Sequence, residues 1–229
     1  MSAYTETELK LRFINRKIWD SITKDTLLQR LAVPGSLQLE ELETTYYDTP
    51  SCALEKRGIA YRIRRRGSEW VATVKAGGIS GGGLHERKEW SIVVNGPRPD
   101  IGPFSNTPLG SIMREAVATE ILTPLFKTSF RRKSMVLKMP EGGKIEFCAD
   151  RGGIFAGGKM KPLQEIELEL RGAKPAAALK LGAALARKYA LLPESRSKYY
   201  QGLKLAGLGP REGEHKPDIG QDLLHLFER

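Results

Sequence analysis

A regular alternation of charged and apolar residues from Glu6 to Phe13 constrains this chain most. Successive side chains of a β-strand point to opposite faces, so a period of two predicts a strand. One face would carry Glu6, Glu8, Lys10 and Arg12. Two carboxylates followed by two cations can hold a divalent metal at one end and an anionic group at the other. A solvated edge strand carries similar patterns, so the rest of the chain decides between the two.

Four later segments repeat this period with polar residues on one face. These faces carry Arg62, Arg64 and Arg66; Thr73 and Lys75; Glu146, Cys148 and Asp150; and Glu165, Glu167 and Glu169. In an ordinary β-sandwich the polar faces of the strands are exposed to bulk water. Solvent exposure does not explain why the acids lie on the first and last strands and the bases on the middle ones. A barrel with a charged interior explains that division.

The remaining pattern predicts an α+β fold: an eight-stranded antiparallel β-barrel with flanking helices. Strands are expected at 6–13, 38–47, 59–66, 70–75, 85–94, 126–139, 144–155 and 163–171. Helices are expected at 17–31, 108–122, 175–191 and 195–205. The glycine-rich run 77–83 lacks the Lys-Ser/Thr of a phosphate-binding loop, which indicates a mobile hairpin tip.

Composition narrows the choice of partner and compartment. Lys and Arg outnumber Asp and Glu by 37 to 27, and this net charge of +10 points to nucleic acid, a membrane surface or a phosphorylated small molecule. No apolar run reaches the ~20 residues of a membrane span, and the charged N-terminal strand argues against a secretory signal. Cys52 and Cys148 are far apart and read as reduced packing residues of a cytoplasmic protein.

A lumen lined with Arg and Lys must hold an anion, because repulsion and desolvation would otherwise destabilise the fold. Arg matches phosphate oxygens two at a time, and Lys supplies a point charge. Carboxylates cannot contact phosphate without a bridging cation, which implies Mg²⁺ or Mn²⁺. A polyphosphate held between cations and metal-bound carboxylates is arranged for phosphoryl transfer.

The chain resembles the CYTH domain, or triphosphate tunnel metalloenzyme superfamily, over roughly residues 4 to 205. The resemblance rests on Glu6-Thr7-Glu8-Leu9-Lys10, Tyr61-Arg62-Ile63-Arg64, Thr73-Val74-Lys75, Arg87-Lys88-Glu89, Thr128-Ser129-Phe130-Arg131-Arg132, Ile145-Glu146-Phe147, Asp150-Arg151-Gly152, Glu165-Ile166-Glu167-Leu168-Glu169 and Ser197-Lys198-Tyr199, in that order. It implies a tunnel open at both ends, in which triphosphates are hydrolysed or cyclised with a divalent metal.

The resemblance also assigns roles to individual residues. Catalytic roles fall to Glu6, Glu8, Lys10, Glu165 and Glu167. Phosphate oxygens would be bound by Lys10, Arg62, Arg64, Lys75, Arg87, Arg132 and Lys198. Metal would be bound by Glu6, Glu8, Glu165 and Glu167, with Glu146 and Asp150 completing the acidic side or pairing with the bases.

The alternative for each of these residues is an interior salt bridge that only stabilises the barrel. It weighs most for Glu169, Arg66 and Arg12, which are expected at a tunnel mouth. Arg65, Arg131 and Glu86 have the opposite parity and are expected to face solvent.

The segments 126–132 and 150–153 are most similar to bacterial inorganic triphosphatases. We therefore expect hydrolysis of inorganic triphosphate (tripolyphosphate) to pyrophosphate and phosphate. A class IV-type adenylate cyclase stays open, although Met1 to Thr5 lacks the His-Phe pair usual there. Other organic triphosphatases, acting on thiamine triphosphate or a nucleotide, and a non-enzymatic polyphosphate-binding module stay open too. Nucleic-acid binding would need the cations on an outer face.

The expected organisation is a tunnel domain over residues 1–207 and a polar tail over 208–229. Bacterial triphosphatases of this type often continue into a helical polyphosphate-binding domain called CHAD. The tail is therefore expected to be a linker and the start of such a CHAD-like domain. A triphosphate or polyphosphate small molecule is the expected partner, with no membrane contact.

Overall fold

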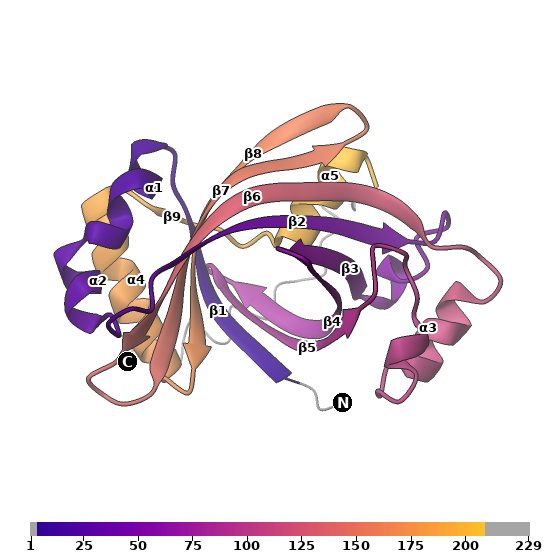
Figure 1. The fold of residues 1–229 in the computed structure, drawn as a ribbon, viewed down its shortest axis with the longest axis horizontal. Helices are drawn as coiled ribbons and strands as arrows, with labels where there is room; N and C mark the ends of the chain where they lie inside the picture. The colour runs from indigo at the N-terminus through magenta and orange to yellow at the C-terminus, as the bar shows by residue number, and fades with distance from the viewer. Residues whose placement is uncertain (1–3, 209–229) are drawn as a thin grey trace.

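Eight antiparallel strands close into a barrel in the computed structural model, which describes residues 4–208 (Figure 1). The strands are β1 (Tyr4–Arg12), β2 (Gln38–Asp48), β3 (Ile59–Arg66), β4 (Glu69–Gly81), β5 (Leu84–Val94), β6 (Thr123–Lys138), β7 (Lys144–Ala156) and β8 (Lys159–Arg171). A two-residue strand, β9 (Leu192–Pro193), pairs with Leu11 and Arg12 at the C-terminal end of β1. The predicted eight-stranded antiparallel barrel is confirmed.

The first strand closes the barrel. The strand order runs β5-β4-β3-β2-β6-β7-β8-β1, and β1 also pairs with β5. Its first half pairs with β5, so that Glu6 lies opposite Arg87. Its second half pairs with β8, so that Lys10 lies opposite Glu167. Both edges of β1 are therefore hydrogen-bonded. Of the charged face predicted for it, Glu6, Glu8 and Lys10 line the inside of the barrel.

Four of the helices lie outside the barrel, and the last one packs against inward-facing side chains of its wall. The helices are α1 (Lys17–Ser21), α2 (Thr26–Leu31), α3 (Gly110–Val117), α4 (Pro175–Tyr189) and α5 (Lys198–Ala206), with 3₁₀ turns η1 (Ile22–Lys24), η2 (Glu55–Arg57) and η3 (Gly102–Phe104). In Figure 1, α1, α2 and α4 gather at one end of the barrel and α3 lies at the other. Among residues 4–208, no helix is both long and apolar enough to cross a membrane.

The apolar core lies between the outer barrel wall and these helices. Leu9, Phe147 and Leu168 of the wall pack with Trp19 and with Leu181 of α4. A second cluster joins the β3–β5 wall to α3, and its buried members include Ile63, Trp90 and Met113. Most apolar side chains of the strands therefore point outward. A third cluster, which includes Tyr46, Phe126 and Leu203, lies on the inward parity of the strands.

Two local predictions need correction. The run 17–31 is not one helix, because Asp25 has an extended ψ of 133° and its side chain accepts from the backbone N–H groups of Leu27 and Leu28 to start α2. The run 77–83 is not all hairpin tip, because β4 continues to Gly81 after a register shift between Ala76 and Ile79.

Other boundaries move less. The helix predicted at 108–122 spans only Gly110–Val117. The last helix begins at Lys198, where the Ser197 side chain accepts from the backbone N–H of Tyr200. The predicted tail and CHAD-like start lie outside the described residues, apart from residue 208.

A glycine in β7 permits a close approach between two strands of the barrel. A Cβ at Gly152 would lie 2.2 Å from the Ser129 carbonyl oxygen and 2.4 Å from the Phe130 Cα of β6. We therefore expect Gly152→Ala to lower the free energy of unfolding by about 1–3 kcal/mol through overpacking. Urea denaturation measures this. Gly96→Ala is the matched control, because a Cβ at Gly96 meets nothing within 4 Å. Equal effects of the two changes would contradict the close approach.

Candidate functional site

The barrel encloses a cavity whose wall is predominantly charged. All seven cations predicted to bind phosphate line it: Lys10, Arg62, Arg64, Lys75, Arg87, Arg132 and Lys198. Three of the predicted carboxylates, Glu6, Glu8 and Glu167, line it as well. The strand parity read from the sequence thus places these residues in one lumen, while their roles there stay predictions.

The cavity adjoins a cleft at each side, which makes it a tunnel. One cleft shares Lys75, Arg87 and Tyr199 with the cavity and is bordered by Arg57 and other residues near η2. The opposite cleft shares Glu6, Arg62, Arg64, Arg132 and Glu169 with it. The charged lining of the cavity therefore continues into both clefts.

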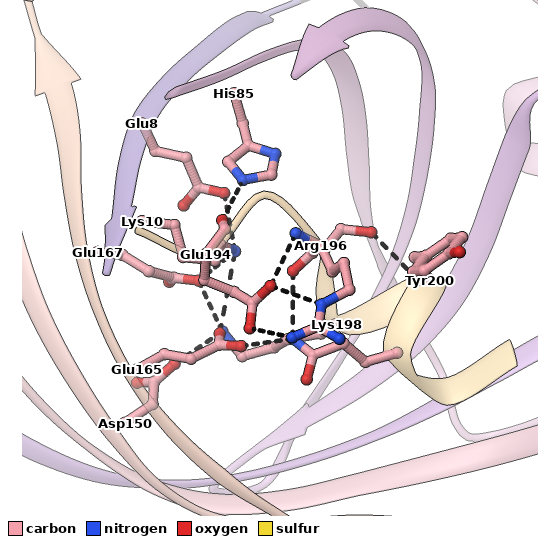
Figure 2. A network of polar contacts seen from close by, with 12 residues as sticks. Glu8, Lys10, His85, Asp150, Glu165, Glu167, Glu194, Arg196, Lys198 and Tyr200 are labelled. Atoms are coloured by element: carbon pink, nitrogen blue, oxygen red, sulfur yellow. Dashed lines mark hydrogen bonds and ion pairs between the residues drawn. The ribbon is translucent and has the colours of Figure 1, made fainter. Parts of the chain in front are cut away.

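One part of the lumen is a buried cluster of compensated charges (Figure 2). Lys198 Nζ lies 3.0 Å from Asp150, 2.9 Å from Glu165 and 2.6 Å from Glu167. Lys10 Nζ lies 2.8 Å from Glu167. Burial disfavours the charged form of Lys10, but Glu167 and Glu8 outweigh it and raise its pKa. Burial likewise disfavours the Glu167 carboxylate, and Lys10 and Lys198 outweigh it and lower its pKa.

Two of the predicted metal ligands lie in salt bridges. Asp150 is fully buried and accepts two hydrogen bonds of 2.7 Å from the Arg132 guanidinium. Glu146 lies 2.7 Å from Arg171, beside the cleft that contains Glu169. Asp150 therefore pairs with the bases, which is one of the two roles that the sequence left open for it.

Two arginines of β3 differ in how the lumen balances their charges. Burial disfavours the charge of Arg62, but Tyr46, Glu89 and Glu6 outweigh it and raise its pKa. Burial lowers the pKa of Arg64 to about 10, with the charges of Arg62 and Arg132 as the next causes. The Arg64 Nε donates to Thr44 at 3.0 Å, while the buried Arg62 Nε has no hydrogen-bond partner among the described residues. Like charges held together out of water favour an anion between them.

The acidic side of the lumen is centred on a residue that the sequence analysis placed at a tunnel mouth. Glu169 lines the cavity and lies opposite Glu8 in the β1–β8 register. Burial raises the pKa of Glu169 to about 8, with the charge of Glu6 as the next cause. Its parity with Glu165 and Glu167 was the available signal, but parity does not give the depth of a residue in a tunnel.

These carboxylates fit a divalent cation by their donor chemistry. Glu6, Glu8 and Glu169 supply hard oxygen ligands, and their mutual repulsion is the kind that a bound cation relieves. Among residues 4–208, no three His, Cys, Asp or Glu side chains already converge as a metal cluster. In the structure Glu6 instead pairs with Lys75, and Glu8 lies 3.1 Å from Lys10.

Sequence reasoning missed three further residues of the lumen: Tyr46, His85 and Tyr199. Burial disfavours the phenolate of Tyr46, but Arg62 and Arg64 outweigh it and lower its pKa. The His85 Nε2 donates to the Glu194 carbonyl at 2.9 Å, and its Nδ1 faces Ser80 Oγ at 3.0 Å. Burial lowers the pKa of His85 to about 4, which favours the neutral ring at pH 7.

The closed antiparallel barrel, with cations and carboxylates along its lumen, is a charged β-tunnel. The family profile described as the CYTH domain matches residues 5–201. The chain belongs to the CYTH domain family.

Individual relatives agree with this assignment. An inorganic triphosphatase from Haemophilus influenzae is 34% identical over 131 residues, which cover 57% of this chain and 36% of that protein. The chain thus matches about a third of that relative's length. A structure from Hippeastrum, titled a putative adenylyl cyclase with a dominant triphosphatase activity, has a TM-score of 0.56 at 17% identity and covers 92% of this chain and 100% of its own.

A putative adenylate cyclase from Bacillus halodurans has a TM-score of 0.55 at 15% identity, with 88% of this chain and 98% of that chain covered. At these identities the two structures support the shared fold alone.

Alternation within β3 generates a binding prediction. Arg62 and Arg64 line the cavity, whereas Arg65 is exposed and donates to the Gly67 carbonyl beside Trp70. Removing a charge-assisted donor from the lumen is expected to weaken tripolyphosphate binding by about tenfold or more in Arg62→Ala and Arg64→Ala. Arg65→Ala is the matched control and should change affinity by less than about twofold, because salt screens an exposed charge. Calorimetric titration in EDTA measures all three. A larger loss in Arg65→Ala would contradict the register of β3.

Proposed function

We propose that this chain hydrolyses inorganic triphosphate (tripolyphosphate) to pyrophosphate and phosphate with Mg²⁺ or Mn²⁺ inside the tunnel. The observation that carries the proposal is the neighbouring pair Arg62 and Arg64, which lines the same cavity as the acidic side and in which burial and the neighbouring cations lower the pKa of Arg64. The pair favours a multiply charged anion, and the opposing carboxylates favour a metal bound to it.

The cations of the lumen would bind phosphate in two different ways. Arg62, Arg64 and Arg87 would contact phosphate oxygens. Lys10, Arg132 and Lys198 are already balanced by carboxylates, so they would contribute their remaining N–H groups and a fixed geometry. Such preorganised donors stabilise developing charge without reorganising during the reaction.

Glu6, Glu8 and Glu169 would hold the metal, with Glu165 and Glu167 as the other predicted ligands. When bound, the metal would polarise a phosphoryl group. A lumen carboxylate would orient the attacking water, which brings the reacting oxygen and phosphorus into line.

The choice of inorganic triphosphate rests on two supports. The relative from Haemophilus influenzae, 34% identical over the aligned residues, is named an inorganic triphosphatase. The cavity wall is predominantly charged, which suits an anion without an organic group. The cleft beside η2 contains Ile79, Tyr199, Tyr200 and Leu203, so a substrate with an organic group, such as thiamine triphosphate or ATP, is the second candidate.

The first prediction from this proposal concerns metal and substrate. We expect phosphate release from tripolyphosphate with Mg²⁺ or Mn²⁺, and its loss in excess EDTA, because carboxylates cannot approach phosphate without a cation. A phosphate assay with tripolyphosphate, ATP, thiamine triphosphate and pyrophosphate measures the preference, with cyclic AMP followed in parallel. Activity that survives excess EDTA would refute the metal requirement. Faster turnover of ATP would favour the nucleotide alternatives, and binding without turnover of any substrate would favour a polyphosphate-binding module.

The second prediction concerns the acids of β1. Glu6→Gln and Glu8→Gln keep the side-chain size and remove the metal-binding charge. Turnover of tripolyphosphate should fall by roughly 100-fold in each, or ~2.7 kcal/mol at 1.36 kcal/mol per decade. Glu86→Gln is the matched control on β5, because Glu86 is exposed and has the outward parity. Wild-type rates for both β1 variants at low metal concentration would show that these acids do not hold the metal.

A further inference from the structure

A second basic cleft lies outside the tunnel, where the end of β1 meets the start of β8 and the segment before α5. Its polar lining consists of the cations Arg12, Lys161 and Arg196, the carboxylates Glu165 and Glu194, and the amides Gln164 and Gln201. None of these residues lines the tunnel cavity, although Glu165 contacts Lys198, which does. Arg12, which was expected at a tunnel mouth, lies in this cleft.

The cleft carries more positive than negative charge. Within residues 4–208, neither Arg12 nor Lys161 has a carboxylate within ion-pair distance. Arg196 is paired with Glu194, at 2.8 Å from Nε to Oε1 and 3.0 Å from NH2 to Oε2 (Figure 2). Burial lowers the pKa of Lys161, and the charge of Arg196 is the next cause. Three cations and two carboxylates line the cleft, and Glu165 is already paired with Lys198, so the pocket is net positive.

Buried amides fix the geometry of this cleft. Gln201, which is 5% exposed, accepts from Lys161 Nζ at 2.6 Å and donates to Glu165 Oε1 at 2.7 Å. Gln164 Nε2 donates to the Phe13 carbonyl at 2.9 Å, beside Arg12. The Lys161 ammonium is therefore held in place before any ligand arrives, which lowers the ordering cost of binding.

We propose that this cleft is a binding site for a small phosphate-class anion, with inorganic phosphate as its simplest member. An Arg fork and a Lys point charge on one concave surface match the oxygens of a tetrahedral dianion. The site does not depend on the reaction in the tunnel. It is connected to the tunnel, because Gln201 joins Lys161 to Glu165 and Glu165 contacts Lys198.

Two variants in combination test the site with inorganic phosphate as the probe. The double change Arg62→Ala/Arg64→Ala weakens phosphate binding in the tunnel. Calorimetric titration of this variant then measures the phosphate binding that remains. Adding Arg12→Ala/Lys161→Ala should weaken that binding by about tenfold or more. The matched control adds Arg16→Ala/Lys159→Ala instead, which removes two exposed cations from the neighbouring surface. This change should lower the affinity for phosphate by less than about twofold. Equal losses in the two, or no loss in the first, would overturn the proposal.

A local measurement on the wild-type chain covers the case in which the combined variant does not fold. The side-chain amide signals of Gln201 and Gln164 are followed by NMR while phosphate is added in EDTA. Saturable shifts of these signals, lost in Lys161→Ala and kept in Lys159→Ala, support the site. Unchanged signals at phosphate concentrations that saturate the tunnel would overturn it. Neither measurement uses catalysis, so its failure is distinct from failure of the proposed triphosphatase.

Discussion

The rest of the structure depends on the pairing of β1 along both of its edges. Without the β1–β5 and β1–β8 ladders the sheet would stay open, and its inner charges would face water. Closure instead holds Lys10 between the carboxylates of Glu8 and Glu167. At that spacing in a water-poor interior, a charge interacts much more strongly than on a surface. The same closure turns the apolar faces of the strands outward, so α1, α2, α3 and α4 are needed to cover them.

In one region of the lumen the buried charges are paired, and in another they are not. This division explains how one barrel can be stable and still bind a charged ligand. Lys198 is held by Asp150, Glu165 and Glu167, so this region satisfies its own charges. Arg64 and Glu169 show the opposite situation, because the pKa of each is shifted toward its neutral form by burial and by neighbours of like charge. A ligand that carries phosphate and metal together would neutralise the positive charge at Arg64 and the negative charge at Glu169. Binding of such a ligand would therefore also stabilise the folded barrel.

Strand parity was the part of the site that the sequence could predict. It identified the inward cations because a period of two needs no tertiary information. It gave the inward parity of Glu169, which lines both the cavity and an adjoining cleft. It did not give the depth of residues along the tunnel, since that depends on how far the neighbouring strands extend. The break at Asp25 and the extension of β4 through its glycines were missed for a related reason: both depend on a single local hydrogen bond or bulge that overrides the broader pattern.

The final segment of the tunnel domain completes the site from outside the eight strands. The Glu194 N–H donates to the Lys10 carbonyl, and the Glu194 carbonyl accepts from His85. Ser80 of β4 donates to the Ser195 carbonyl, so three strands hold this segment across the barrel. It delivers Lys198 at the first residue of α5, into a group of carboxylates that would otherwise lack that cation. Because an uncompensated buried carboxylate is strongly destabilising, barrel closure and docking of α5 reinforce one another. The geometry of the tunnel is therefore a property of the whole domain rather than of the strands alone.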